Sequence, residues 1–154
     1  MQKEYTEQYI KDAVNVAIAE LLKNDRKLLE LDVNERSITH KFAEYLKTEF
    51  PDWDVDCEYN RDGHDTKKVC IASKQVSSDD SEGTTVYPDI IVHKRGMGNN
   101  LLVIEAKKDT NCSDADKFDK EKLGAYKREL KYKFALFTKF FTGKNQKDPK
   151  LEYI

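Results

Sequence analysis

The sequence predicts an α/β (α+β) fold in which a central mixed sheet of about four to five strands is flanked by helices. Two stretches before Pro51 have apolar residues at helical spacing, and several short apolar runs typical of strands follow. A further helical stretch then precedes one more apolar run. The expected order along the chain is therefore helix, helix, four strands, helix and strand.

Two helices are expected in the N-terminal third of the chain. Residues 6–23 carry apolar side chains at i, i+3, i+4 and i+7, and a charged connector follows over residues 24–32. The second helix has Ile38 and Phe42 on its apolar stripe and ends at Pro51. Glu35 precedes Ile38 by three residues, so it lies near the start of this helix, on or beside the stripe. A carboxylate there either complements the helix dipole or points into a site.

The middle of the chain is expected to form the sheet. Alternating or continuous apolar runs predict the strands, and a Gly/Asn-rich turn over residues 96–100 makes the last two a hairpin or an adjacent pair. The third helix is expected to begin near Ser113 or Asp114, which are plausible N-cap residues. The expected strands cover residues 53–59, 68–72, 86–93, 101–107 and 132–138.

The length and composition predict one domain over residues 1–154, with a helix and connector at 1–31 and a loop or tail at 140–154. No apolar stretch approaches the roughly 20 residues of a membrane span, so no membrane partner is expected. Three cysteines leave an odd number without a CxxC pair, which favours a reducing compartment. We expect a cytoplasmic protein.

Charged side chains on two apolar runs are the strongest functional signal. Asp89 opens the run Asp-Ile-Ile-Val, and Glu105 and Lys107 close the run Leu-Leu-Val-Ile-Glu-Ala-Lys. Because successive strand residues alternate between faces, Glu105 and Lys107 project from the same side. Two carboxylates beside an amine indicate a divalent metal and a water that it activates. Taken singly, Asp89 fits a turn residue and the other two fit an exposed strand edge.

The pattern resembles the PD-(D/E)XK motif of restriction-endonuclease-like nucleases. Pro88-Asp89 is separated by fifteen residues from Glu105-Ala106-Lys107, and Glu35 lies on a preceding helix. The resemblance implies a restriction-endonuclease-like core and a Mg²⁺ ion, for which Mn²⁺ substitutes. The ion would be held by Asp89, Glu105 and the backbone carbonyl of Ala106. Lys107 would orient the attacking water, and Glu35 would act through a water or a second ion.

Other residues resemble those of small, stand-alone bacterial members of the same superfamily. The resemblance extends to His93, Arg95 and Lys122, with Tyr126 expected as core packing. Cations beside a metal site suit a polyanion, so Arg61, Lys68, His93, Arg95 and Lys122 are candidate nucleic-acid contacts. The alternative for His93 and Arg95 is pairing with acids of the sheet. Residues 120–150 carry ten Lys or Arg against three acids, which fits either a polyanion surface or a solvated helix face.

These observations predict a Mg²⁺-dependent hydrolase of phosphodiester bonds, an endonuclease acting on DNA in preference to RNA. One alternative is a catalytically inactive nuclease-fold module that binds nucleic acid or a protein partner. Another is a scaffold with an acidic strand edge and a fortuitous motif. With 154 residues there is little room for a target-recognition domain, so a homodimer or a partner that delivers the substrate is expected.

Overall fold

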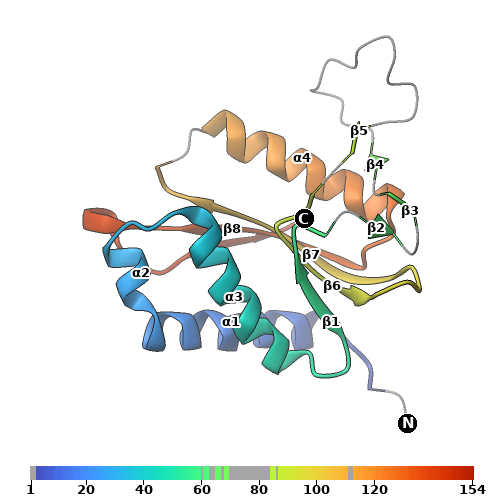
Figure 1. Cartoon of the computed structure of the whole chain (residues 1–154), viewed down its shortest axis with the longest axis horizontal. Helices are drawn as coiled ribbons and strands as arrows, with labels where there is room; N and C mark the ends of the chain where they lie inside the picture. The colour runs from blue at the N-terminus through green and yellow to red at the C-terminus, as the bar shows by residue number, and fades with distance from the viewer. Residues whose placement is uncertain are drawn as a thin grey trace.

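The computed structural model describes residues 3–59, 61–62, 65–66, 68–69, 84–85, 87–110 and 113–154. A mixed five-stranded sheet lies between two helical layers, which confirms the predicted fold class (Figure 1). The helices α1 (Glu7–Asn24) and α3 (Glu35–Glu49) cover one face of the sheet, and α4 (Ser113–Glu129) covers the other.

The long strand β7 is the centre of the sheet. The strand order is β1-β6-β7-β8-β9, and every neighbouring pair is antiparallel except β7 and β8. The chain leaves β7, crosses the sheet as α4 and returns as β8, which is the connection that a parallel pair requires. The strands are β1 (Asp54–Cys57), β6 (Ile90–Lys94), β7 (Asn99–Lys108), β8 (Phe134–Phe140) and β9 (Lys150–Tyr153).

Local capping fixes the starts of the two N-terminal helices. The Thr6 hydroxyl accepts a hydrogen bond from the Tyr9 backbone N–H at 3.2 Å, and the Asn34 side chain accepts one from the Ser37 N–H at 2.9 Å. The Asn34 cap makes Glu35 the first helical residue of α3, as the sequence predicts. Among the helices that the structure describes, none combines the length and apolar composition needed to cross a bilayer.

Three regular elements lie where the sequence predicts irregular chain. The charged connector contains a short helix, α2 (Arg26–Glu30), with Leu29 fully buried. The expected tail at 140–154 contains a 3-10 turn, η1 (Gly143–Asn145), and then β9, so that part of the prediction is wrong. Strand β9 forms because Leu151 pairs in register with Thr138 of β8. A four-residue strand is too short to show a reliable alternation in the sequence.

The remaining strands are shorter than expected. Strand β2 (Arg61–Asp62) pairs antiparallel with β3 (Asp65–Thr66), and β4 (Lys68–Val69) pairs antiparallel with β5 (Thr84–Thr85). The rest of the expected strand at 68–72 lies outside the described residues. The strand expected at 86–93 begins only at Ile90, where the antiparallel pairing with β7 starts.

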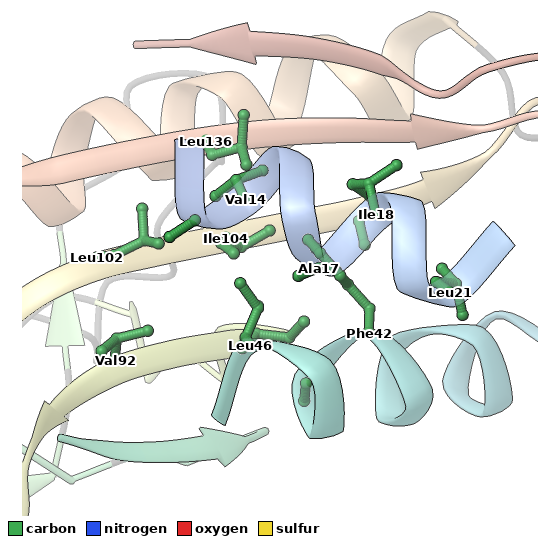
Figure 2. Packing of buried hydrophobic residues seen from close by; sticks show 14 of the residues in the cluster. Val14, Ala17, Ile18, Leu21, Phe42, Leu46, Val92, Leu102, Ile104 and Leu136 are labelled. Carbon is green, nitrogen blue, oxygen red and sulfur yellow. The ribbon is translucent and has the colours of Figure 1, made fainter. Parts of the chain in front are cut away.

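The larger part of the core lies between the sheet and the pair α1 and α3. Figure 2 shows Ala17 of α1 and Phe42 of α3 meeting below the apolar strand residues Leu102 and Ile104. Alternate residues of the same strands, such as Val103, face α4 instead. Because both faces of β7 are covered, its sequence is a continuous apolar run, and a charged residue on it must be held by specific partners.

We expect Phe42→Ala to lower the free energy of unfolding by about 3–5 kcal/mol, because a large cavity would remain. The Phe42 ring is fully buried and packs edge-on against Phe140, with ring centroids 5.8 Å apart. Val16→Ala, on α1 at 45% exposure, serves as a control and should change stability by less than about 0.5 kcal/mol. Denaturant unfolding followed by circular dichroism gives both values, and equal losses would contradict this packing.

Candidate active site

Asp89 and Glu105 lie opposite each other on neighbouring strands. Ile90 of β6 pairs with Ile104 of β7, so the residues one step further along the ladder, Asp89 and Glu105, face each other. Asp89 Oδ2 accepts a hydrogen bond from the Ala106 backbone N–H at 2.8 Å. The two carboxyl groups are close enough that each shifts the pKa of the other. The sheet register itself therefore brings together the first two predicted site residues.

The environment of this pair disfavours two negative charges. Glu105 is 1% exposed, and burial followed by repulsion from Asp89 raises its pKa well above the usual range. Burial also raises the pKa of Asp89, although the hydrogen bond from Ala106 opposes that shift. Like charges at close range with little water cannot both ionise without a nearby cation. Positive charge brought to this pair would favour its ionised form.

Lys107 lies on the same face of β7 as Glu105, as the strand alternation predicts. Its Nζ is 3.0 Å from Asp119 Oδ2 and 3.8 Å from Glu35 Oε1. Burial lowers the pKa of Lys107, but the two carboxylates outweigh burial and the net shift is upward. Lys107 is consequently an ammonium at neutral pH. It can donate hydrogen bonds and stabilise negative charge, but it cannot accept a proton from water.

Glu35 reaches the same region from the opposite helical layer. Its Oε2 accepts a hydrogen bond from the Lys108 backbone N–H at 3.2 Å. The neighbouring Lys108 side chain turns away and pairs with Asp32 at 2.7 Å. Glu35 therefore ties the first turn of α3 to the end of β7 and places a carboxylate beside Lys107. Of the two sequence interpretations, this position favours a side chain that points into a site.

A polar face of α4 closes the site, and sequence reasoning missed its central residue. Asp119 is 2% exposed and contacts both Lys107 and Lys122, the latter at 2.8 Å. Lys122 Nζ also lies 3.4 Å from Glu105 Oε1, and the Tyr126 hydroxyl donates to the same oxygen at 3.1 Å. Burial lowers the pKa of Lys122, but Glu105 and Asp119 outweigh it and raise the pKa overall. Tyr126 is fully buried, as expected for core packing, and in addition it contacts Glu105.

Two of the predicted nucleic-acid contacts, His93 and Arg95, lie away from this cluster. His93 is 3% exposed, and its Nε2 lies 2.7 Å from Asp56 Oδ2. Arg95 Nε donates to the same carboxylate oxygen at 2.8 Å. Burial opposes ionisation of Asp56, but Arg95 and His93 outweigh it and lower the pKa of this carboxyl. These contacts favour the alternative in which His93 and Arg95 pair with acids of the sheet.

The other predicted nucleic-acid contacts divide into two groups. Lys122 is partly exposed and pairs with Glu105 and Asp119 in the network described above. Arg61 and Lys68 begin β2 and β4, but their side chains lie outside the described residues.

A cleft of about 410 Å³ opens beside the carboxylates. At its mouth, Arg36 Nε lies 3.3 Å from Glu58 Oε1, and both side chains are at least half exposed. Glu58 has a left-handed φ of 50°, and its backbone N–H donates to the Asp89 carbonyl oxygen at 3.2 Å. The cleft is lined by Glu35, Arg36, Thr39, His40, Cys57, Glu58 and Asp89.

The donor set fits a hard divalent cation in part. Within the described residues, no group of three or more His, Cys, Asp or Glu side chains is arranged to hold a metal ion. The resemblance, however, implies only two carboxylates and one backbone carbonyl, namely Asp89, Glu105 and Ala106. Burial raises the pKa of both carboxyl groups, and repulsion from Asp89 adds to the shift at Glu105. Oxygen ligands of this kind suit Mg²⁺ or Mn²⁺, with further positions taken by water and substrate.

Comparisons with known proteins give no family assignment. No protein-family model, curated protein or solved structure matches the chain.

We expect Glu105→Gln to stabilise the fold by about 1 kcal/mol at neutral pH in the presence of a chelator, because it removes a buried charge. Unfolded Glu105 loses its proton near pH 4.5, whereas the folded residue keeps it to higher pH. Wild-type stability therefore falls as pH rises above that value, and the variant lacks this loss. Urea unfolding at several pH values measures the difference, which should disappear at or below about pH 4.

Glu152→Gln is the matched control, since Glu152 pairs with Lys120 at a more exposed position. Its effect should stay within about 0.5 kcal/mol at every pH. A Glu105→Gln variant that is less stable than the wild type at neutral pH would contradict the raised pKa.

Proposed function

We propose that this chain is a divalent-metal-dependent nuclease that hydrolyses phosphodiester bonds, with DNA as the preferred substrate. One observation carries the proposal: the adjacent carboxyl groups of Asp89 and Glu105 are held beside the ammonium of Lys107. Phosphodiester hydrolysis needs a hydroxide-like nucleophile and positive charge near the phosphate oxygens. A divalent cation held by the carboxylate pair, with a protonated lysine beside it, would meet both needs.

Asp89, Glu105 and the Ala106 carbonyl would hold Mg²⁺, and Glu35 lies close enough to Lys107 to act through a water. When bound, the ion would lower the pKa of a coordinated water and neutralise charge on the phosphate. The Ala106 N–H fixes one oxygen of Asp89, which restricts the carboxylate to one orientation. Tyr126 and Lys122 restrict Glu105 in the same way from α4.

Lys107 would act by donating hydrogen bonds. Because its pKa is raised, it enters the reaction with its proton and can orient the attacking water or stabilise charge on a phosphate oxygen. Asp119 holds the ammonium at 3.0 Å and sustains its protonated state. Asp119 is therefore proposed as a positioning residue.

The cleft beside α3 provides a route for the substrate. Asp89 and Glu35 line its inner end, and Arg36 stands at the mouth in an exposed ion pair with Glu58. An exposed pair of this kind contributes little to stability, so Arg36 can exchange Glu58 for a phosphate at small cost.

We expect Lys107→Met to slow cleavage at least about 100-fold, because it removes the donor that stabilises the transition state. Labelled single- and double-stranded DNA and RNA are incubated with the protein in Mg²⁺, Mn²⁺ or chelator. Lys150→Met on the exposed edge of β9 is the control and should keep wild-type activity. Metal-dependent cleavage that persists at the full rate in Lys107→Met would refute the mechanism. Binding without any cleavage by the wild type would instead favour the inactive nucleic-acid-binding module.

We expect Asp119→Asn to slow cleavage by about 10–100-fold, the usual cost of losing a residue that orients an active-site group. The side-chain amide of asparagine is neutral, so it cannot provide the negative charge that pairs with Lys107 and Lys122. Asp119→Glu should recover part of the rate, because it restores the negative charge. Single-turnover rates on the preferred substrate, with folding checked by circular dichroism, measure both effects. Equal activity of the Asn variant and the wild type would exclude a positioning role.

A further inference from the structure

A second concave site lies at the opposite end of the sheet from Asp89. Lys94 closes β6, whereas Asp89 immediately precedes this strand, so about five strand residues, or roughly 17 Å, separate them. The cavity there measures about 560 Å³, which is within the usual range of small-ligand sites. Its walls come from the N-terminal segment, the turn before β1, the end of β6 and the residue before β8.

Two aromatic rings form part of the wall. Tyr5 and Trp53 pack edge to face, with ring centroids 5.6 Å apart and planes at 89°. Both side chains are partly buried against the core and partly open to the cavity. The Tyr5 hydroxyl donates to Asp52 Oδ2 at 3.2 Å, which fixes the Tyr5 ring. Lys94 Nζ lies 5.4 Å from the centroid of the Trp53 ring, so a planar ligand stacked on that ring would take the place of this ammonium group.

Three ammonium groups approach the same cavity from separate segments. Lys3 Nζ donates a hydrogen bond to the Tyr9 hydroxyl oxygen at 2.9 Å, and Lys94 Nζ donates one to the Asp52 backbone carbonyl. These partners are neutral, so the contacts position the two lysines without cancelling their charge. Lys133 is the third and is exposed. Against Glu4 and Asp52 of the same wall, the cavity carries a net charge of about +1.

We propose that this cavity binds a nucleobase linked to a phosphate, either as a free nucleotide or as the end of a single strand. The Trp53 ring would stack on the base, the Tyr5 ring would contact it by its edge, and the lysine ammonium groups would hold the phosphate as point charges. Asp52 can accept hydrogen bonds from the amino group of a base. A purely apolar ligand would leave the five charged wall residues without polar contacts. An inorganic anion would make no use of the aromatic rings.

Trp53 makes the proposal directly testable, because it is the only tryptophan of the chain. The wild-type protein is titrated in chelator with AMP, adenosine, inorganic phosphate, and a short single-stranded oligodeoxynucleotide with or without a 5′-phosphate. A stacked base should quench Trp53 fluorescence saturably with AMP. Adenosine and phosphate alone should bind at least about tenfold more weakly. If AMP and the strand both bind, the site accepts free nucleotides; if only the strand binds, it is a strand-end site.

Lys133→Met should weaken AMP or strand binding by about tenfold and reduce its salt dependence. This lysine is exposed, so the variant should fold normally. Lys150→Met is the matched control and should bind like the wild type.

Asp89→Asn should also leave the quenching unchanged, which separates this site from the proposed nuclease centre. Absence of quenching by every base-containing probe would overturn the proposal. So would equal binding of adenosine and AMP, an unaltered affinity in Lys133→Met, or a loss of quenching in Asp89→Asn.

Discussion

The burial of Glu105 in the central strand is the constraint on which the rest of the site depends. Strand β7 is covered on both faces, so a carboxyl group on it has almost no water. Such a group must be neutral or must be met by positive charge and hydrogen-bond donors. The neighbouring Asp89 makes the demand greater, because a second carboxyl group faces the first across the strand ladder.

Helix α4 supplies the positive charge and the hydrogen-bond donor that Glu105 needs, from residues spaced along one face of the helix. Asp119, Lys122 and Tyr126 lie at i, i+3 and i+7, so they share the side that packs on β7. Lys122 and Tyr126 contact Glu105 directly. Asp119 balances the charge of Lys122 and of Lys107 on β7. Removing one member leaves a partly buried charge without its partner. The network is therefore better understood as one unit than as separate ion pairs.

The sequence alone predicted those parts of the fold and the site in which the residue pattern repeats with the simple period of a strand or a helix. The alternation on β7 predicted that Glu105 and Lys107 share a face, and the start of α3 predicted the position of Glu35. Asp119 could not be found in this way, because α4 carries many charged residues and its polar spacing resembles a solvated face. Only the packing of the helix on β7 distinguishes the buried acid from the exposed ones.

Distance along the chain was also a poor guide to distance from the site. Arg95 and His93 follow Asp89 closely in sequence, yet an extended strand carries them to the far end of the sheet and to Asp56. Strand β9 escaped prediction for a related reason, since its pairing with β8 is a tertiary contact. Strand direction and register decide which charged residues come into contact. Neither can be predicted from the composition.

The charges around the cleft have a consequence for how a polyanion would bind. Glu35, Glu58 and Asp89 line the cleft, whereas Arg36 is the one arginine or lysine among the described residues that line it. A phosphate entering this space alone would meet net repulsion. A divalent cation held by the carboxylates would reverse that sign, so cation and substrate would each strengthen the binding of the other. The basic side chains at the far end of the sheet are too distant to replace the cation, because exposed charges beyond about 8–10 Å are largely screened at physiological salt. Binding of a divalent cation and of a polyanionic substrate in the cleft, as proposed, would then be one coupled equilibrium.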